Sequence, residues 1–356
     1  MESLYDITII GLGPAGSTLA RLLSDDFKII AIDKKNNKGQ EGFHKPCGGL
    51  LAPDAQKAIA EMGLSLYKNI LVDPQIFSVR TIDLDSGRTN HYQRGYINMD
   101  RHKFDLWMKS LIPSSVEINH NSTCQSIEKT ESGYKITYVK EGKTHSIESR
   151  IVVGADGAKS MVRNFLYPNK KMNSYLSIQQ WFNAEVETPF YSCIFDSQNT
   201  DCYSWGLFKD KYFIFGGAYP MNNARKHFEN QKRSLIERGY VLGEVVKTES
   251  CMVLRPKSFR DFATGYDNAF LIGEAAGFIS PSSLEGISYG INSSRILAEV
   301  LNSKSKELNE KYNRKTLKIK LELMIKLFKC LFLYNPFLRR IVMASKIAAI
   351  NVETKL

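Results

Sequence analysis

Three glycines near the amino terminus have the spacing of a loop that binds phosphate groups. Gly11, Gly13 and Gly16 form a GxGxxG pattern, with Pro14 and Ala15 between them. In such a loop the first glycine permits a tight turn, the second lets the backbone approach a pyrophosphate, and the third lets a helix pack against the strand. Proline suits the first helical position, and the helix amino terminus faces the phosphate charge. These residues predict a dinucleotide-binding site.

The segments around this loop predict the elements that must position it. Residues 5–10 are apolar and β-branched, as in a buried strand, and residues 17–24 have leucines at helical spacing. Residues 28–32 indicate a second strand, which is followed by Asp33 and Lys34. A carboxylate at the position of Asp33 accepts hydrogen bonds from ribose hydroxyls, and its charge disfavours a 2′-phosphate. This order of elements predicts nucleotide binding without distinguishing FAD from NAD.

Three further segments follow the first strand–helix–strand unit and extend the pattern. They are residues 45–50, 154–163 and 270–277, the last of which continues to Ile287. Together with the glycine loop, they resemble the flavoprotein group that includes para-hydroxybenzoate hydroxylase and the geranylgeranyl reductases. The resemblance covers roughly residues 4–302, with four motifs in the same order. It implies a Rossmann-like domain that binds FAD.

The resemblance also implies cofactor contacts. Asp156 would hold the middle of the dinucleotide, and Arg101 would contact the FAD phosphates or ribityl chain. Glu274 would meet the ribityl or phosphate region; most of the group has Asp there, which is one methylene shorter. The helix that begins near Gly286 would point its amino terminus at the flavin and stabilise its reduced, anionic form. The complete set of implied cofactor-binding residues is Gly11, Gly13, Pro14, Ala15, Gly16, Asp33, Lys34, Cys47, Gly48, Gly49, Arg101, Asp156, Gly273, Glu274, Gly277, Pro281, Gly286 and Ile287.

Two segments resemble the geranylgeranyl reductases more than the aromatic hydroxylases. One is the Cys-Gly-Gly segment 47–49, and the other is 203–208, which is similar to the reductases' Tyr-x-Trp-x-Phe-Pro substrate motif but lacks the final Phe-Pro. Tyr203 and Trp205 share one strand face, so either a substrate pocket or the core would contain them. Cys47 is the candidate catalytic residue beside the flavin, as a proton donor or a redox gate; the alternative is a small buried hydrophobe.

The expected fold class is α/β, with a Rossmann-like FAD-binding domain, an inserted β-meander, a second β-sheet substrate domain and a C-terminal helical segment. The meander is predicted from the β-rich stretches 76–98 and 115–148. The expected boundaries are 1–171 for the first part of the FAD-binding domain, 172–255 for the substrate domain, 256–302 for the second part of the FAD-binding domain, and 303–356 for the basic helical segment.

The net charge of +11 is concentrated in the tail. Residues 303–356 hold 13 Lys and Arg against 4 Asp and Glu, so nine of the eleven net charges fall there. A nearly neutral body with a basic tail argues against nucleic acid as a partner. In the tail, one helical face carries Leu317, Leu321, Met324, Phe328 and Leu331. We prefer a helical cap that packs on the substrate domain; the alternative is a basic amphipathic surface that docks on anionic lipid.

The cysteine spacing and the hydropathy pattern indicate in which cellular compartment the protein is expected. The six cysteines form no CxxC pair and no cluster with zinc spacing, so we predict no metal site and a reducing environment. The amino-terminal apolar stretch continues directly into the glycine loop, and no run of 18 uncharged apolar residues occurs. We therefore expect a cytoplasmic protein, with peripheral contact at the inner membrane face as a further option.

Three functions are consistent with these residues. The first is reduction of carbon–carbon double bonds in an apolar, isoprenoid-like small molecule or lipid, with hydride from reduced FAD. The second is an FAD-dependent monooxygenase that hydroxylates a small or lipophilic substrate, and the third is a flavin redox carrier or sensor at a membrane surface. Because no second GxGxxG domain is present, electrons would come from transiently bound NAD(P)H or from a ferredoxin-type carrier.

Overall fold

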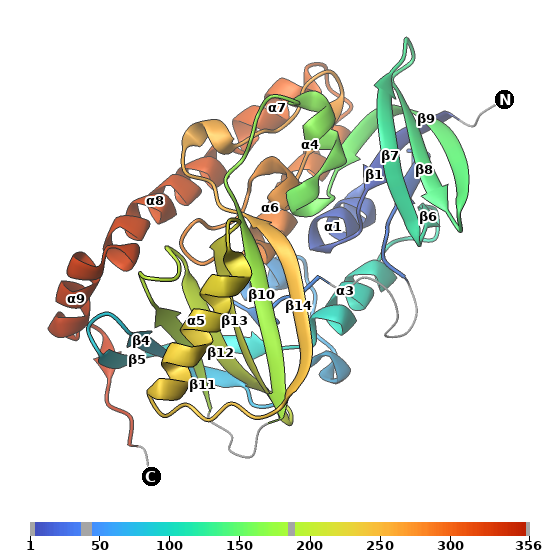
Figure 1. The fold of residues 1–356 in the computed structure, drawn as a ribbon. Coiled ribbons are helices and arrows are strands. Elements are labelled where there is room, and N and C mark those ends of the chain that lie inside the picture. Colours follow the sequence, from blue (N-terminus) through green and yellow to red (C-terminus); the bar gives the residue numbers. More distant parts are fainter. Residues whose placement is uncertain (1–3, 37–44, 184–188, 354–356) are drawn as a thin grey trace.

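The computed structural model describes residues 4–36, 45–183 and 189–353. Two β-sheets lie side by side, and helices cover their outer faces (Figure 1). The first sheet belongs to the nucleotide-binding part that the sequence predicts, and the second forms the larger β-rich part. The mixed α/β class is as expected.

The first sheet has seven strands in the order β6-β2-β1-β9-β8-β7, with β15 added beside β9. Strands β6, β2, β1, β9 and β15 are parallel, whereas β7, β8 and β9 form an antiparallel meander. The strands are β1 (Leu4–Ile10), β2 (Ile29–Ile32), β6 (Glu117–Asn119), β7 (Ser122–Lys129), β8 (Tyr134–Lys140), β9 (Lys143–Gly154) and β15 (Ala269–Leu271).

The register of the parallel strands explains why distant motifs meet. Ile10 is level with Ile32 on β2 and with Gly154 on β9, and Gly154 is level with Leu271 on β15. Carboxyl ends of parallel strands form one edge, where ligands bind in open α/β sheets. The loops that follow β1, β9 and β15 therefore begin side by side.

Helices cover the first sheet because its central strands are apolar on both faces. On one face, Ile7 and Ile9 pack with Leu19 of α1 and Leu297 of α6. On the other, Ile10 belongs to the cluster that contains α4 and the start of α8. The helices are α1 (Pro14–Leu22), α2 (Pro53–Ala60), α3 (Arg101–Ser110), α4 (Met161–Leu166), α5 (Ala224–Glu237), α6 (Ile287–Asn302), α7 (Leu308–Lys315), α8 (Leu317–Tyr334) and α9 (Pro336–Ser345).

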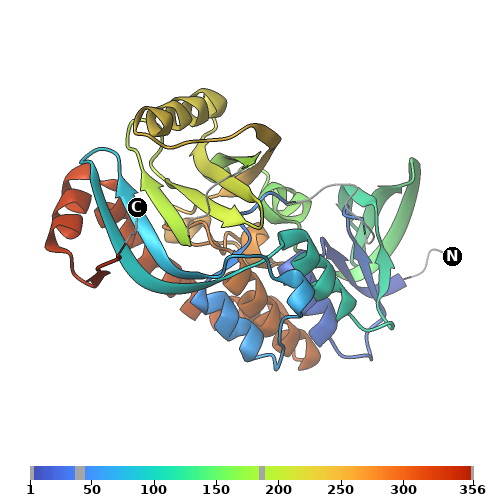
Figure 2. The same cartoon turned by 90° about the horizontal axis from the view of Figure 1, so that it is seen from below.

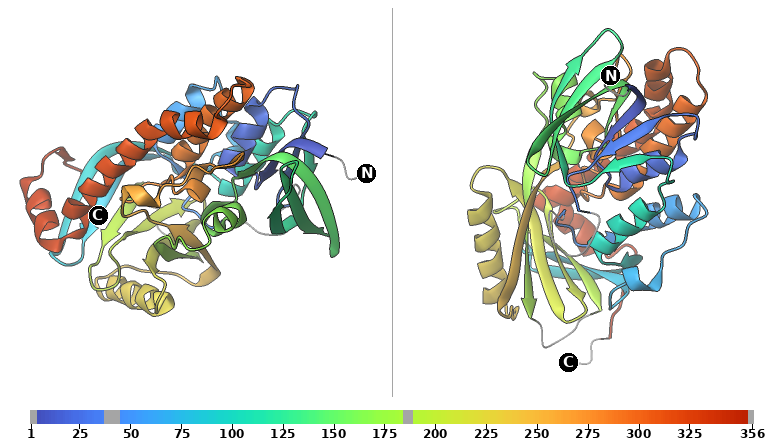
Figure 3. Two further views of the ribbon diagram at one scale, coloured as in Figure 1. Left: turned by 90° about the horizontal axis from the view of Figure 1, so that it is seen from above. Right: turned by 90° about the vertical axis from the view of Figure 1, so that its right-hand side faces the viewer.

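The second sheet has nine strands in the order β14-β10-β13-β12-β11-β4-β5-β16, with β3 paired to β5. Helix α5 covers one face, where Phe215 and Tyr219 pack on Phe228 and Leu235. The other face is turned toward the loops of the first sheet (Figure 3). The strands are β3 (Leu50–Leu51), β4 (Ile76–Asp83), β5 (Arg88–Asn98), β10 (Ser174–Asn183), β11 (Phe190–Phe195), β12 (Tyr203–Lys209), β13 (Tyr212–Pro220), β14 (Val245–Leu254) and β16 (Ala349–Ile350).

The placement of residues 76–98 differs from the prediction. These residues do form a hairpin, β4 and β5, but the hairpin belongs to the second sheet, because β4 pairs in parallel with β11. Only the β7-β8-β9 meander lies in the first sheet. An alternating pattern identifies a strand and its buried face, but not the strand with which it pairs.

The tail follows one side of the molecule from the first sheet to the second (Figure 2). It ends in β16, a short strand that pairs with β5 and was not predicted from the sequence. The predicted packing face of α8 is wrong: Leu317, Leu321 and Phe328 are exposed, whereas Ile319 and Leu323 are buried. Because α8 carries apolar residues around most of its circumference, periodicity alone did not identify the buried side.

Candidate functional site

The glycine loop connects β1 to α1 and requires glycine at two positions. Gly11 has φ of +94°, and a Cβ there would lie 2.8 Å from the carbonyl oxygen of Ala155. A Cβ on Gly16 would lie 1.9 Å from the carbonyl oxygen of Gly11. Gly13, by contrast, has no atom within 4 Å of such a Cβ, and it caps α1 without a side-chain hydrogen bond. The open approach at Gly13 and the free amino terminus of α1 fit an anion.

The second and third motifs lie against this loop. A Cβ on Gly273 would be 3.1 Å from the Cβ of Ala15, and one on Gly157 would be 3.7 Å from a carboxylate oxygen of Glu274. The buried Arg163 joins the two motifs, since its guanidinium donates to the carbonyl oxygen of Ala275 over 3.1 Å. Segments separated by more than a hundred residues therefore form one site.

Asp156 presents an unpaired oxygen to this site. Its Oδ2 accepts a hydrogen bond of 2.6 Å from the backbone N–H of Met161. Its Oδ1 is buried and has no hydrogen-bond partner among the described residues. Burial raises the pKa of Asp156. A buried acceptor without a donor is costly, so a ligand hydroxyl that donated to Oδ1 would stabilise this arrangement.

Asp33 follows β2 and is buried against α3. Its carboxylate forms an ion pair with Lys109 near the end of that helix. The sequence predicted a ribose contact at Asp33 without a cationic partner. Lys109 was missed, because nothing in its local sequence indicates that the last turn of α3 faces β2. The adjacent Lys34 has a pKa that burial and the nearby Lys35 lower.

Arg101 and Asp105 form a buried charged group at the start of α3. Arg101 Nε donates to Asp105 Oδ1 over 2.9 Å, and Lys35 Nζ lies 2.5 Å from Asp105 Oδ2. Burial opposes ionisation of Asp105, but Arg101 and Lys35 outweigh it and hold its pKa well below its ordinary value. The i,i+4 spacing of Arg101 and Asp105 was the sequence signal for this pair.

Glu274 already has protein partners for both oxygens. Oε1 accepts from the backbone N–H of Leu254 over 3.0 Å, and Oε2 is paired with Lys45. Burial opposes the charge of Lys45, but Glu274 outweighs it and raises the lysine's pKa. Glu274 thus connects residue 45 to the end of β14, and any contact with a cofactor would be shared with these partners.

The Cys-Gly-Gly turn is held by a buried lysine. Gly49 has φ of +65°, and a Cβ there would lie 2.4 Å from the carbonyl oxygen of Met99. Lys209 Nζ donates to the carbonyl oxygens of Gly49 and Met99 and to Asn98 Oδ1, over 3.2, 2.7 and 2.6 Å. Burial lowers the pKa of Lys209 to about 7. Only glycine fits this turn without strain.

Cys47 faces the cationic start of α3. Its Sγ accepts a hydrogen bond of 3.4 Å from the backbone N–H of Gly49. The pKa of Arg101 is raised, since burial is outweighed by Asp105 and, to a smaller extent, by Cys47. The thiol therefore lies next to a guanidinium, in a position from which it could contact a ligand, and its catalytic role stays a prediction.

The loop before α6 is fixed by side chains from three elements. The carbonyl oxygen of Pro281 accepts from Arg255 Nε over 2.9 Å. The next two carbonyl oxygens, of residues 282 and 283, accept from the hydroxyls of Tyr334 and Tyr203 over 2.5 and 2.8 Å. Before the loop, Gly277 adopts φ of +82°, and after it Gly286 caps α6, whose first residue is Ile287. The segment predicted to lie along the flavin is therefore rigidly placed.

Tyr203 and Trp205 lie on the face of the second sheet opposite α5. Between them, Ser204 bonds Gln231 of α5, which shows that the neighbours point the other way. The Tyr203 hydroxyl holds the loop at Ser283 instead of standing free. Trp205 Nε1 is buried without a hydrogen-bond partner in the described chain, and a Cβ on Gly48 would lie 3.7 Å from the Trp205 ring. Tyr203 is thus a positioning residue, and Trp205 keeps an unused donor beside the Cys-Gly-Gly turn.

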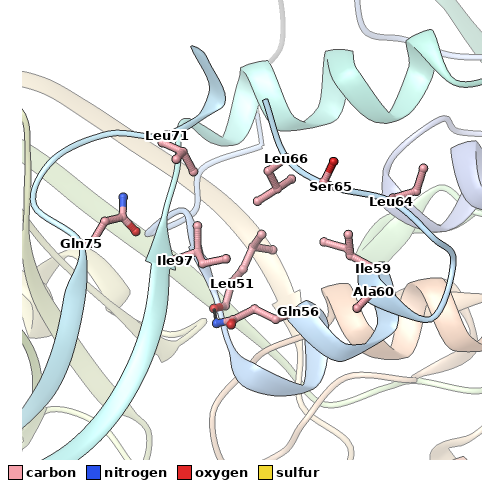
Figure 4. A pocket seen from close by; sticks show the side chains of 10 residues that line it. All are labelled: Leu51, Gln56, Ile59, Ala60, Leu64, Ser65, Leu66, Leu71, Gln75 and Ile97. Atoms are coloured by element: carbon pink, nitrogen blue, oxygen red, sulfur yellow. Dashed lines mark hydrogen bonds between the residues drawn. The ribbon is translucent and has the colours of Figure 1, made fainter. Parts of the chain in front are cut away.

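A separate apolar hollow of about 390 Å³ lies beside α2 and β5 (Figure 4). None of the residues predicted to bind cofactor or substrate lines it. Its amide side chains are engaged, since Gln56 donates to the carbonyl oxygen of Leu51 and Gln75 to that of Val72. The residues around it are Leu51, Gln56, Ile59, Ala60, Leu64, Ser65, Leu66, Leu71, Gln75 and Ile97.

Taken together, the residues of the site fit a dinucleotide. Gly13 leaves room for a diphosphate, and Asp156 Oδ1 lacks a donor. Burial and the neighbouring Lys35 lower the pKa of Lys34, and a bound anion would favour the charged form of Lys34.

Within the described residues, no helix is long and apolar enough to cross a membrane.

Comparison with solved structures identifies the fold. A geranylgeranyl bacteriochlorophyll reductase-like protein of Thermoplasma acidophilum superposes with a TM-score of 0.81 and 18% identity, covering 97% of this chain and 92% of that one. PqsL of Pseudomonas aeruginosa, described as a probable FAD-dependent monooxygenase, gives 0.71 and 17%, with 97% and 100% covered. The p-nitrophenol 4-monooxygenase PnpA of Pseudomonas putida gives 0.70 and 15%, with 97% and 94% covered.

Sequence comparison identifies the family. A family model described as lycopene cyclase protein matches residues 6–235. Protein CbrA of Escherichia coli strain K12 is 51% identical over 346 residues, which are 97% of this chain and 98% of the relative. Protein CbrA of Shigella sonnei gives the same values. The chain belongs to the lycopene cyclase protein family and, within it, to the group of CbrA proteins.

Proposed function

We propose that the protein is an FAD-dependent oxidoreductase that reduces carbon–carbon double bonds of an apolar, isoprenoid-like substrate. The observation that carries the proposal is the convergence of three glycine-containing loops at one sheet edge, with the unpaired Oδ1 of Asp156 among them. The similarity to a reductase-like protein with a TM-score of 0.81 supports the fold that this chemistry uses. Reduced FAD would supply the hydride when bound.

The chain's own residues would bind, orient and exclude water. Gly13 and the amino terminus of α1 would receive the diphosphate, and Asp156 Oδ1 would accept a hydroxyl of the ligand. The fixed carbonyls of residues 281–283 would keep the loop before α6 in place. Preorganisation of this kind places reacting groups without reorganisation at the moment of reaction.

The face of the second sheet supports an apolar substrate. Val79, Leu207 and Ile214 are buried there with Tyr96 and Tyr191. A surface of aliphatic and aromatic side chains matches a hydrocarbon chain and keeps water from the reacting carbons.

A monooxygenase is the second candidate, because PqsL and PnpA share the fold. In that case the same residues would bind FAD, and turnover would consume oxygen. A redox carrier or sensor is the third candidate, and it would show a bound flavin without any substrate turnover. The electron donor, NAD(P)H or a ferredoxin-type protein, is to be found by testing which of them reduces the bound flavin.

Anaerobic mixing separates these candidates. The protein is loaded with FAD, reduced with dithionite, and mixed with a geranylgeranylated lipid while the flavin absorbance is followed. Reoxidation without oxygen, together with a product heavier by two hydrogens per reduced bond in mass spectrometry, is expected. A flavin that stays reduced until oxygen is admitted, with hydroxylated product, would favour the monooxygenase, and a protein that takes up no FAD would refute all three.

A further inference from the structure

Glu285 lies between the fixed loop and the first residue of α6. Its Oε1 accepts a hydrogen bond of 3.4 Å from the Tyr96 hydroxyl of β5. The guanidinium of Arg94 stands over the Tyr96 ring, 5.1 Å from its centre. Glu285 thus places a carboxyl group against the substrate face of the second sheet, next to the loop predicted to lie along the flavin.

The groups around Glu285 come from several elements. Burial raises its pKa, Arg94 on β5 and Lys326 on α8 work against this, and Asp54 on α2 adds to it. Tyr96 and Tyr203 face it with phenols whose pKa burial raises, and Cys193 on β11 faces it with a thiol whose pKa burial raises to about 12. Within this cluster Glu285 contributes a carboxyl group, and burial favours its protonated form, which is the form that donates a proton.

The position of Glu285 is fixed by a chain of phenols. The Tyr191 hydroxyl donates to that of Tyr203 over 3.1 Å, and Tyr203 donates to the carbonyl oxygen of Ser283, two residues before Glu285. The rings of Tyr96 and Tyr191 pack edge to face at 5.4 Å. A carboxyl group held in this way needs little reorganisation to deliver a proton along one direction.

We propose that Glu285 is the general acid of the reduction. Glu285 would deliver its carboxylic proton to one alkene carbon, and the other carbon would take the hydride that reduced FAD supplies when bound. The double bond would thereby be reduced, the reduced flavin would return to FAD, and Glu285 would be left as a carboxylate beside Arg94, to be reprotonated from solvent. This inference rests on the proposed function, since it names the proton donor of that same reaction.

Glu285→Gln tests the proposal in the FAD-loaded full chain. The amide can still accept the Tyr96 hydrogen bond but has no acidic proton, so anaerobic reoxidation of the reduced flavin by geranylgeranylated lipid should slow about 10²- to 10⁴-fold. The wild-type rate should fall as pH rises through the pKa of Glu285, and this fall should be absent in the variant. Glu128→Gln, at an exposed site on β7, is the control and should leave the rate and its pH profile unchanged.

A readout without turnover accompanies the kinetics. Infrared difference spectra over a pH titration should contain a protonated carboxyl band that Glu285→Gln removes and Glu128→Gln keeps. Tyr96→Phe removes a donor to the carboxylate, so the band and the kinetic limb should both move to higher pH. If the wild-type protein reduces the lipid and Glu285→Gln has the same rate and pH profile, the acid role of Glu285 is overturned and the proposed function stands. If no polyprenyl substrate reoxidises the reduced flavin of the wild-type protein, the proposed function is overturned as well.

A second inference comes from the tail, independently of the chemistry. Helices α8 and α9 and the turn after them expose apolar side chains to solvent, with exposed fractions from 41% to 77%. We call this surface the tail face. It consists of Leu317, Leu321, Ile325, Phe328, Leu331, Phe332, Phe337, Ile341, Val342 and Ile347.

The tail face cannot turn inward, because the opposite sides of both helices are anchored. Ile319 and Leu323 of α8 are buried in the core of the first sheet. On α9, the buried Arg339 donates to Asp83 Oδ1 over 2.8 and 3.0 Å and also pairs with Asp85. A large exposed apolar surface on a fixed scaffold marks an interaction site.

The charges beside the tail face select the partner. Exposed cations flank it at Lys318, Lys329, Arg340 and Lys346, whereas residues 317–346 contain a single acid, Glu322. A second copy of the chain in face-to-face contact would oppose like charges. An anionic lipid surface accepts both kinds of group: the apolar side chains enter its boundary region, and the cations are attracted to its negative charge.

We propose that the tail face docks on anionic lipid bilayers. Tyr334 of α8 bonds the carbonyl oxygen of Ser282, so the docked helix also contacts the loop of the candidate active site. This arrangement would place a membrane-dissolved hydrocarbon near the apolar face of the second sheet.

Co-sedimentation with vesicles tests the docking. The full chain should sediment with phosphatidylglycerol-containing vesicles, and less with pure phosphatidylcholine or at high salt. Phe328→Glu and Phe337→Glu should each reduce binding at least tenfold. Phe77→Glu, which changes an equally exposed phenylalanine on β4, should not. Equal binding by all variants, or a concentration-dependent dimer that the tail substitutions abolish, would overturn the proposal.

Discussion

At the residue scale, the carboxylates of the candidate site differ in whether the protein itself supplies a partner for their oxygens. Both oxygens of Glu274 have donors, Asp33 has Lys109, and Asp105 has Lys35 and Arg101. Among these described carboxylates of the candidate site, Asp156 has a buried oxygen, Oδ1, with neither a hydrogen-bond donor nor an ion-pair partner. A folded protein tolerates such an atom when a ligand supplies the missing donor.

Replacing Asp156 by Asn should weaken FAD binding about tenfold. The amide keeps one acceptor but loses the negative charge and the second acceptor, which together are worth about 1.5 kcal/mol in a hydrogen bond to a charged group. Fluorescence titration of the apoprotein with FAD measures the change. Asp267→Asn, at an exposed ion pair with Lys129, is the control and should bind like wild type; equal affinity of both variants would contradict the role of Asp156.

Asp105 should make stability depend on pH in the acidic range. Because its pKa is lower in the folded than in the unfolded protein, its contribution is present in full above the ordinary carboxyl pKa of about 3.9 and is lost as pH falls through the folded value. Asp105→Asn should therefore be less stable than wild type by about 3–5 kcal/mol at pH 7. Urea unfolding should show that this difference shrinks at pH 3; a constant difference at both pH values would disprove the assignment.

At the element scale, the position of α9 depends on a buried ion pair as well as on the packing of its buried Met343. Arg339 reaches from α9 to Asp83 and Asp85 at the turn between β4 and β5, and its guanidinium stands over the ring of Phe195. The apolar side chains of this helix point mostly outward. Arg339 and Met343 thus hold the inner side of the helix, and its part of the tail face stays exposed.

Arg339→Met should release α9 from the second sheet. Removal of one partner leaves two carboxylates buried or half-buried without a counter-ion, which costs about 3–5 kcal/mol. Limited proteolysis should cut the tail after α8 faster than in wild type, and urea unfolding should begin at a lower concentration. The neighbouring Arg340→Met, at an exposed position, should change stability by less than about 0.5 kcal/mol. Equal protease resistance of the two variants would exclude this function of Arg339.

At the scale of the whole molecule, the candidate site lies where the two sheets meet. The glycine loop belongs to the first sheet, whereas the Cys-Gly-Gly turn is fixed by Lys209 to β12 and β5 of the second. Tyr203 of the second sheet also holds the loop before α6. A ligand that contacted both the glycine loop and the Cys-Gly-Gly turn would couple the stability of the first sheet to that of the second.

Added FAD should therefore stabilise the apoprotein as one cooperative unit. At free FAD one hundred times above its Kd, mass action contributes about 2.7 kcal/mol, and Tm rises by a few degrees. Differential scanning calorimetry should show a single transition that moves as a whole. If two transitions appeared and only one of them moved, the ligand would contact only one of the two sheets. Riboflavin, which lacks the diphosphate and adenosine, is the control and should have little effect on Tm.

The sequence by itself determined those features whose physics is local. The tight turn at Gly11 and the start of α1 at Pro14 are properties of short segments, and with the strand patterns around them they predicted the first sheet and the helix that follows β1. The alternation along residues 203–208 also predicted correctly that Tyr203 and Trp205 share a face. These inferences held because a strand or a glycine turn depends on neighbours within a few residues.

Only the tertiary structure decided which surfaces meet. Residues 76–98 form the hairpin that local alternation predicts, yet they pair with β11, more than a hundred residues away. Helix α8 is helical as expected, yet its buried side is not the one that its strongest stripe indicates. The ion pairs of Asp33 and Glu274 and the surroundings of Glu285 likewise depend on long-range packing. Strand partners and buried helix faces depend on how much apolar surface the whole folded chain buries and on which charges it pairs. No short segment contains that information.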